Sequence, residues 1–189
     1  MPTAMTRKRD AVATRATILA AAKRAFTEKG FDGAGMRDIA ARAGVTAALV
    51  NRYFGSKEAL FEEAVVPALN MDELMAGDRA TFGERAVRYL ITRSPEGSDL
   101  DPTLAFVRSA GSLTVASMLH HAVGGNVISR LAHWLGGHDP EQRAALIVAH
   151  IAGFDMMRHV VDVSALGPEH LEALAPRFAR TLQRYVDDA

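Results

Sequence analysis

Two neighbouring side chains, Asn51 and Arg52, carry the hydrogen-bonding groups that can read the bases of DNA. Asparagine can pair bidentately with adenine and arginine with guanine, and an alanine methyl can contact the methyl group of thymine. On a helix that begins at Ala47, both residues share one face with Ala47 and Ala48. A base contact of this kind is worth roughly 1–3 kcal/mol of discrimination. This face is therefore a candidate base-reading surface.

The reading face needs a helix that is anchored on its other side. Leu49 and Val50 supply apolar side chains there. Residues 37–60 fit two short helices that are separated at Gly44, with Thr46 capping the second of them and Ser56 opening a third. Two short helices joined by a tight glycine-containing turn indicate a helix-turn-helix, whose second helix enters the major groove.

Four further residues lie where they could meet DNA phosphates. Contacts of this kind set the register of the protein on the duplex and carry no sequence information. We expect them from Arg37, Thr46, Tyr53 and Lys57.

The net charge of zero hides an uneven distribution of charged residues. Residues 1–61 contain 11 Lys and Arg against 5 Asp and Glu, a balance of +6, and residues 62–189 contain 11 against 17, a balance of −6. Chance segregation could produce this pattern. A basic first third on an acidic remainder is also what a DNA-binding module attached to a larger body would show.

The segment from about residue 11 to 61 resembles the DNA-binding domain of the TetR/AcrR family of bacterial repressors. The resemblance is carried by residues 18–22 (ILAAA), 26–31 (FTEKGF), 37–40 (RDIA), 43–46 (AGVT) and 53–60 (YFGSKEAL). It implies a three-helix head joined through a fourth helix to an all-helical regulatory domain. The sequence departs from the family pattern at Gly35, at Ala47–Ala48 and at Asn51–Arg52. Gly35 lacks the hydroxyl that bonds phosphate in the family, and the Asn51–Arg52 pair implies a distinct operator preference.

The rest of the chain also shows a helical period of apolar residues, so the expected fold class is all-α. We expect a flexible basic arm over residues 1–10, the helix-turn-helix domain over 11–56, and a helical regulatory and dimerisation domain over 57–189. Helices are predicted over 14–29, with Gly30 ending the helix, and over 82–92, 104–110, 111–135, 140–163 and 169–186. The pair Gly124–Gly125 is a weak point in the helix over 111–135.

The family resemblance implies a homodimer whose interface is built from the last two helices, 140–163 and 169–186. It also implies a small-molecule effector bound among the other helices. The first of the two interface helices is apolar nearly all round from Ala144 to Phe154, which predicts burial on every side, either within its own subunit or against a partner. The candidate lining residues could equally be plain core: Tyr89, Phe106, Met118, His121, Trp134, Phe154 and Met157.

The sequence shows few of the residue patterns that catalysis or metal binding needs. Cysteine is absent, and no nucleophile–base–acid triad or phosphate-cradling loop is legible. Asp155 and His159 stand one helical turn apart, but a metal site needs three or four ligands and the sequence suggests no third. We therefore expect no metal, no cofactor and no enzymatic activity.

Together with the family resemblance, these observations favour a cytoplasmic, ligand-responsive transcriptional regulator, a repressor that binds a near-palindromic operator in double-stranded DNA. No apolar run is long enough to span a membrane. Two rival interpretations stay open: a non-specific architectural DNA-binding protein, and an all-helical enzyme with a vestigial DNA-binding head.

Overall fold

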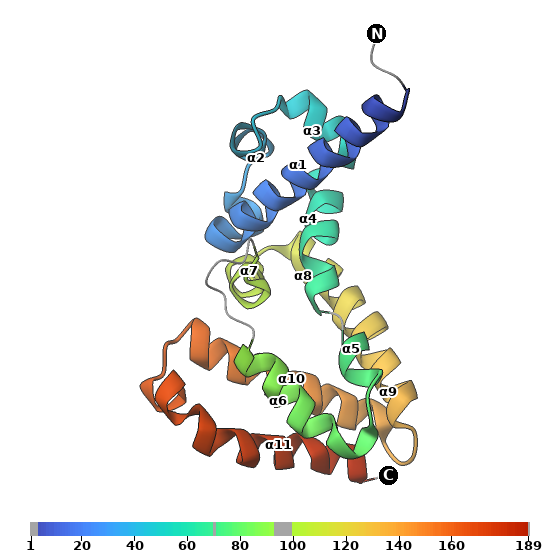
Figure 1. The fold of residues 1–189 in the computed structure, drawn as a ribbon, viewed down its shortest axis with the longest axis vertical. Helices are drawn as coiled ribbons and strands as arrows, with labels where there is room; N and C mark the ends of the chain where they lie inside the picture. Colours follow the sequence, from blue (N-terminus) through green and yellow to red (C-terminus); the bar gives the residue numbers. More distant parts are fainter. Residues whose placement is uncertain (1–3, 70, 93–99, 189) are drawn as a thin grey trace. The chain divides into compact units, whose positions relative to one another are not determined.

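The chain is all-helical in the computed structural model, which describes residues 4–69, 71–92 and 100–188; no strand occurs in these ranges (Figure 1). The described residues fold into two compact units. The first contains the residues up to 68 together with 100–118, and the second contains 69–92 together with 119–188. The predicted fold class is therefore confirmed.

The first unit begins with four helices: α1 (Ala4–Gly33), α2 (Met36–Arg42), α3 (Ala47–Phe54) and α4 (Lys57–Val65). Local sequence explains their ends. The Thr46 hydroxyl accepts a hydrogen bond from the N–H of Leu49 at 3.3 Å, and the Ser56 hydroxyl accepts one from the N–H of Ala59 at 3.2 Å. Both serve as the N-caps that the sequence predicts.

The expected flexible arm over residues 1–10 is not what the structure shows from Ala4 onward, because α1 is already helical there. Residues 4–13 contain neither glycine nor proline, so nothing in the sequence stops the helix from extending toward the N-terminus. At the other end, Gly30 has φ 66° and ψ −176°, and these angles interrupt the helical backbone. The predicted end of the regular helix at Gly30 is confirmed.

Three phenylalanines form the centre of the first unit. The Phe61 ring meets Phe26 and Phe31 nearly edge-on, with ring centroids 4.9 and 5.3 Å apart, and the Phe26 and Phe31 rings stack at 6.4 Å. Such pairs are favoured over and above the area that they bury. Since Phe61 lies on α4, this helix is held to α1 by the core of the first unit.

A later segment, α7 (Pro102–Ser109), also packs against α1 in the first unit. The guanidinium of Arg108 donates to the carbonyls of Thr27 and Glu28, at 2.5 and 2.9 Å. The hydroxyl of Ser109 accepts a hydrogen bond from the N–H of Phe31 at 2.9 Å. A Cβ on Gly30 would lie 2.4 Å from the carbonyl oxygen of Arg108, so only glycine allows the two backbones to approach this closely.

The predicted regulatory and dimerisation domain over 57–189 stays a prediction, and the two compact units divide the chain at other places. Both α4 and α7 belong with the helix-turn-helix. The physical reason is that α4 supplies Phe61 to the first core, and α7 caps the end of the regular part of α1. Neither contact follows from the local sequence pattern.

The second unit contains α5 (Asp72–Met75), α6 (Phe82–Thr92), α9 (Ser129–Leu135), α10 (Pro140–His159) and α11 (Leu171–Asp187). The prediction for α6 matches its bounds. The core is formed by buried side chains of α6, α9, α10 and α11, among them Phe82, Leu131, Ile147 and Leu182. The predicted helix over 111–135 is present as α8 (Leu113–Leu119), a π-helix η3 (His120–Ile128) and α9.

Helix α10 is shorter than predicted, and its own subunit covers only part of its surface. It ends at His159 instead of 163, and Asp162 just beyond it adopts a left-handed backbone with φ 56°. Its apolar surface is not covered on every side, because Leu146 is 44% exposed and Met157 is 40% exposed. An apolar pattern around a helix does not say which side its own subunit covers.

Arg79 supports the end of α9, and Arg143 supports the turn after α9 and the last turn of α11. Arg79 donates to the carbonyls of Trp134 and Leu135, and Arg143 donates to those of Gly136, His138 and Tyr185. Arg143 is buried. The last carbonyls of a helix lack partners within it, so these guanidinium groups supply the missing donors. Asp139, the N-cap residue of α10, makes no side-chain cap hydrogen bond. Its carboxylate lies 2.9 Å from Nδ1 of His138 instead.

Candidate DNA-reading surface

The turn between α2 and α3 is built by local backbone chemistry. Gly44 has φ 67°, a left-handed conformation that glycine adopts without a steric penalty. The N–H of Gly44 bonds the carbonyl of Ala41 at 3.2 Å, and the N–H of Val45 bonds that of Ala40 at 3.0 Å. These bonds close α2 and direct the chain into α3. The result is the helix-turn-helix that the sequence predicts.

Helix α3 presents different side chains to its two sides. Val50 and Phe54 are buried against the first unit. Ala48, Asn51 and Arg52 are exposed. Ala47, Leu49 and Tyr53 are half-buried, so Leu49 is a weaker anchor than the sequence pattern indicates. The face that carries the candidate base-reading groups is accordingly open to solvent, as a DNA-reading helix requires.

Arg15 on α1 supports the end of α3, a role that sequence reasoning missed. Its guanidinium carbon lies 4.8 Å from the centroid of the Phe54 ring, and the same guanidinium forms a bidentate ion pair with Glu63 on α4. One side chain thus contacts three helices. Arginine suits this position because it stacks on aromatic rings and pairs bidentately with carboxylates.

The candidate phosphate-contacting residues are in different environments. Arg37 and Thr46 are exposed, whereas Tyr53 and Lys57 are half-buried. The Lys57 ammonium lies 4.4 Å from the centroid of the Phe31 ring and 3.5 Å from the carbonyl oxygen of Asp32. In this structure Lys57 therefore has partners of its own, and a phosphate contact would compete with them.

An ion-pair network ties α2 to the end of α1. Arg42 pairs with Glu28 at 2.7 Å and with Asp38 at 3.4 Å, and Lys29 pairs with Asp38 at 2.7 Å. The hydrogen bond from Arg42 lowers the pKa of Glu28, and the one from Lys29 lowers that of Asp38. The hydrogen bond from Glu28 in turn raises the pKa of Arg42. These pairs fix the first helix of the motif without using the exposed Asn51 and Arg52.

The residues predicted to line an effector cavity are distributed over both units. Phe106 and Met118 belong to the first unit, and the other five belong to the second. The Phe154 ring stacks on Phe178 at 4.6 Å, and Met157 is exposed on α10. Tyr89 and Trp134 are half-buried beside the second core. A common cavity for all seven therefore stays a prediction.

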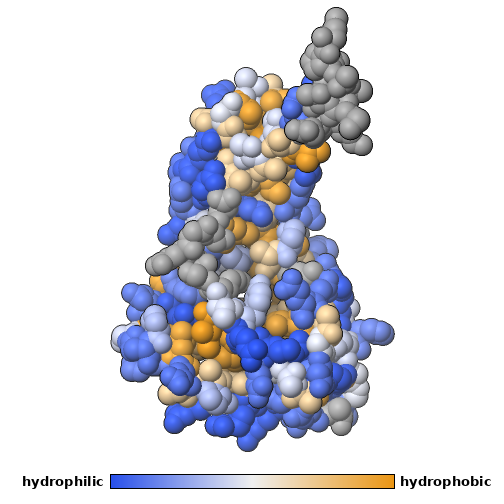
Figure 2. Space-filling view, in the orientation of Figure 1, coloured by the Kyte–Doolittle hydropathy of each residue, from blue (hydrophilic) through white to orange (hydrophobic). Residues whose placement is uncertain are grey.

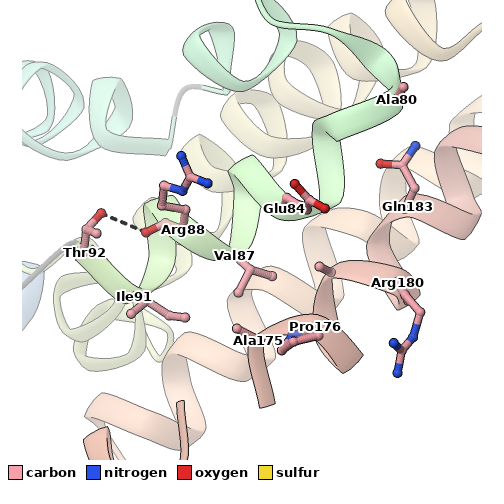
Figure 3. A pocket seen from close by; sticks show the side chains of 11 residues that line it. Ala80, Glu84, Val87, Arg88, Ile91, Thr92, Ala175, Pro176, Arg180 and Gln183 are labelled. Atoms are coloured by element: carbon pink, nitrogen blue, oxygen red, sulfur yellow. Dashed lines mark hydrogen bonds between the residues drawn. The ribbon is translucent and has the colours of Figure 1, made fainter. Parts of the chain in front are cut away.

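One surface groove of about 530 Å³ lies between α6 and α11 (Figure 3). In Figure 3 the side chains of Val87 and Ile91 point from α6 toward Ala175 and Pro176 on α11, while the guanidinium groups of Arg88 and Arg180 point away from that gap. The groove thus has an apolar floor. None of the seven predicted ligand residues is among its lining residues.

A second, more open cavity of about 610 Å³ lies between α5 and α9. Its lining includes Trp134, one of the predicted ligand residues, together with Met75, His133 and the ion pair between Arg130 and Asp72. The indole of Trp134 is held by the Arg79 guanidinium, whose carbon lies 4.8 Å from the indole ring centroid, and by Phe82, whose ring centroid lies 5.3 Å away.

The described residues form neither a cluster of metal ligands nor a membrane-spanning helix. Within the described ranges, no three His, Asp or Glu side chains come together as a metal site would need. Asp155 and His159 do meet, with Nδ1 of the histidine 3.1 Å from Oδ1 of the aspartate. None of the described helices combines the length and the apolar character that crossing a membrane would take.

The two-unit helical fold and the exposed reading helix define the class of protein: a helix-turn-helix DNA-binding transcriptional regulator. Comparison with protein families supports this assignment. Residues 18–64 match the family described as "Bacterial regulatory proteins, tetR family", and residues 80–186 match "Tetracyclin repressor-like, C-terminal domain". The chain belongs to the TetR family of transcriptional regulators. No curated protein sequence gives a significant match.

Solved structures agree over nearly the whole chain. A TetR-family regulator from Streptomyces coelicolor A3 is 28% identical, covers 92% of this chain and 94% of its own, and superposes with a TM-score of 0.60. A transcriptional regulator from Rhodococcus sp. Rha1 is 26% identical over 90% of this chain and 96% of its own, with a TM-score of 0.61. NalD from Pseudomonas aeruginosa, the secondary repressor of the MexAB-OprM multidrug efflux pump, shares the fold at 23% identity, 92% and 96% coverage and a TM-score of 0.66.

Proposed function

We propose that this protein is a repressor that binds a near-palindromic operator as a homodimer and releases it when a small-molecule effector binds. The observation that carries the DNA-binding part is the division of α3, with Val50 and Phe54 buried while Ala48, Asn51 and Arg52 are exposed. Asn51 and Arg52 would contact base edges, with Ala47 and Ala48 beside them. Arg37, Thr46, Tyr53 and Lys57 would contact phosphates.

The base-reading role of Arg52 can be tested by selecting DNA fragments that the purified protein retains. For Arg52→Ala, we expect relaxed base preference at one position of each half-site, with each wrong base discriminated roughly 1–3 kcal/mol less. For Lys57→Ala, we expect weaker binding to every sequence and a smaller dependence on salt. An unchanged consensus for Arg52→Ala would refute the base-reading role.

The same measurement separates the proposal from non-specific architectural binding. A regulator binds its selected site far more tightly than random DNA at the same salt concentration, typically by 10³-fold or more. Equal affinities for both would favour the architectural interpretation. The balance of −6 over residues 62–189 already favours the regulator, because an acidic body is repelled by DNA.

The proposed dimer is supported by an uncovered apolar stripe on α10. Leu146, Ala149, Gly153 and Met157 recur at helical spacing, and Leu146 and Met157 are among the exposed large hydrophobic residues of the chain. A Cβ at Gly153 would meet no atom within 4 Å, so its own subunit does not require glycine there. Small residues let two helices approach closely. We place the partner's α10 and α11 against this stripe.

A substitution at Gly153 tests this interface directly. Since the position has open space in its own subunit, Gly153→Glu should fold normally while placing a charge in the middle of the apolar stripe. We expect sedimentation to change from a dimer, twice 20.3 kDa, to a single chain of 20.3 kDa. Gly111→Glu, at another open and exposed glycine, is the matched control and should stay dimeric. A dimeric Gly153→Glu variant would place the interface elsewhere.

The effector is proposed to bind in the second unit near Tyr89, Trp134 and Phe154, with His121 and Met157 as further candidates there. The other two predicted residues, Phe106 and Met118, belong to the first unit. An effector can release DNA only if it binds one conformation of the protein better than the other. Trp134 is the single tryptophan of the chain, so its fluorescence reports on this region alone. We expect that a metabolite which releases the selected DNA also changes this fluorescence. Release without any fluorescence change would move the effector away from Trp134.

A further inference from the structure

The chain from Leu113 to Leu135 is helical, but the helix type changes in the middle of this segment. Between α8 and α9, the nine residues of η3 form a π-helix, in which hydrogen bonds run from i to i+5. A π-helix is normally a single turn inside an α-helix. Nine residues wound as an α-helix would make about 2.5 turns. A π-helix places more residues in each turn, so η3 contains more chain than an α-helix with the same number of turns.

Two glycines within η3 have no structural requirement for glycine. Gly124 and Gly125 are not among the residues with positive φ. A Cβ on either one would meet no other atom within 4 Å. The two usual reasons for glycine, a left-handed backbone and a close approach of another chain segment, are both absent at these positions. What glycine does here is weaken the helix, by about 1 kcal/mol relative to alanine at each position.

The packing of η3 also differs from that of its flanks. None of its nine residues is buried. Leu119 directly before it is buried, and so are Leu131 and Leu135 after it. The segment is thus anchored at both ends and has no buried side chain of its own, with Ile128 at its end packing against the core of the second unit. Segments with few buried apolar contacts rearrange at low free-energy cost.

From these observations we propose that η3 is a two-state winding switch. Its backbone changes between the π-helical form and an α-helical form. The π-helix holds one residue more than an α-helix with the same number of turns, and in the α-helical form this surplus residue is displaced from the helix. Either form satisfies nearly all the backbone N–H and C=O groups, so the two lie close in free energy. The change alters the rotation of the helix between Leu119 and Leu131, and with it the set of η3 side chains that face α10. This inference does not depend on DNA binding.

Deleting one residue tests the proposal. In an α-helix a deletion turns everything that follows by about 100° and shifts it by about 1.5 Å. In η3 the surplus residue should absorb the loss, with the π-helix rewinding as an α-helix. We therefore expect deletion of Gly125 to change the melting temperature by less than about 4 °C, which corresponds to about 1 kcal/mol for a chain of this size.

The matched control is deletion of His133, an exposed residue of α9. This deletion rotates Trp134 and the buried Leu135 out of their positions, so we expect a fall in melting temperature of more than about 10 °C, or no folded protein. If deletion of Gly125 is as damaging as deletion of His133, then η3 has no surplus residue and the proposal fails.

Hydrogen exchange on the unaltered protein gives an independent test. We expect the amides of residues 123–127 to exchange at least about 100-fold faster than those of residues 131–135. In the variant without Gly125, locked in the α-helical form, the exchange of the same segment should slow at least about tenfold. Equal protection of the two segments in the unaltered protein would overturn the proposal. Such a failure would leave the proposed DNA-binding function untouched, since neither measurement involves DNA.

Discussion

The contact between α1 and α7 makes Gly30 a position where a single methyl group should be costly. With φ 66° and ψ −176°, Gly30 occupies a backbone region that is essentially restricted to glycine. A Cβ added there would lie 2.4 Å from the carbonyl oxygen of Arg108 and 2.7 Å from its carbonyl carbon. Both neighbouring atoms belong to the backbone. The overlap can be relieved only if α7 moves as a whole.

The expected effect of Gly30→Ala follows from these two terms. Backbone strain in this region costs about 1–3 kcal/mol. Forcing an extra methyl group into a packed contact costs about another 1–3 kcal/mol. The free energy of unfolding should therefore fall by roughly 2–6 kcal/mol, a large part of the 5–15 kcal/mol typical of folded proteins. The melting temperature should fall by about 5–20 °C.

Urea unfolding followed by circular dichroism measures this change, with Gly111→Ala as the control. Gly111 lies just beyond α7, its φ is not positive, and a Cβ on it would meet no atom within 4 Å. Its substitution should change stability by no more than about 0.5 kcal/mol. If Gly30→Ala is as stable as the Gly111→Ala control, α7 does not dock on α1 at this distance, and the assignment of α7 to the first unit is wrong.

Three further outcomes are expected. The pKa values of Glu28 and Asp38 are lowered in the folded protein, so the unfolded chain binds protons more readily than the folded one. The stability that these two carboxylates contribute is therefore present above their ordinary pKa values. It is lost as pH falls below about 4. Between pH 6 and about 3, the double variant Glu28→Gln/Asp38→Asn should lose less stability than the unaltered protein, as measured by the urea midpoint of unfolding. Arg143→Met leaves three carbonyl acceptors without their donor, so the free energy of unfolding should fall by about 2–4 kcal/mol in the same assay. The control Arg177→Met, on the exposed side of α11, should lower it by under about 0.5 kcal/mol. Thr46→Ala removes the N-cap of α3 and should cost about 1 kcal/mol, and Thr46→Ser should restore it.

Features that depend on neighbouring residues could be predicted from the sequence. The caps at Thr46 and Ser56 and the turn at Gly44 rest on local backbone chemistry, and the structure places each as expected. The division of α3 into a buried and an exposed side follows largely from helical periodicity. The weak point at Gly124–Gly125 was also visible, although a helical period does not distinguish α from π winding.

Features that depend on distant residues could not be predicted. The bond between Phe31 and Ser109 joins positions 78 residues apart, and the stacking of Arg15 on Phe54 crosses from α1 to α3. Short motifs contain no information about such pairs. The uncovered stripe on α10 escaped prediction for another reason. An all-apolar surface indicates burial, but the sequence does not say whether the covering atoms come from the same chain.

The docking of α7 has a practical consequence for protein engineering. A designer who exchanges the reading heads of two related regulators would naturally cut the gene once, shortly after α4. In this protein such a cut separates Gly30 from the Arg108 that covers it, and leaves the carbonyls of Thr27 and Glu28 without the guanidinium that they bond. A transplantable head must bring residues 100–118 with it, so a working hybrid needs three junctions where sequence order suggests one.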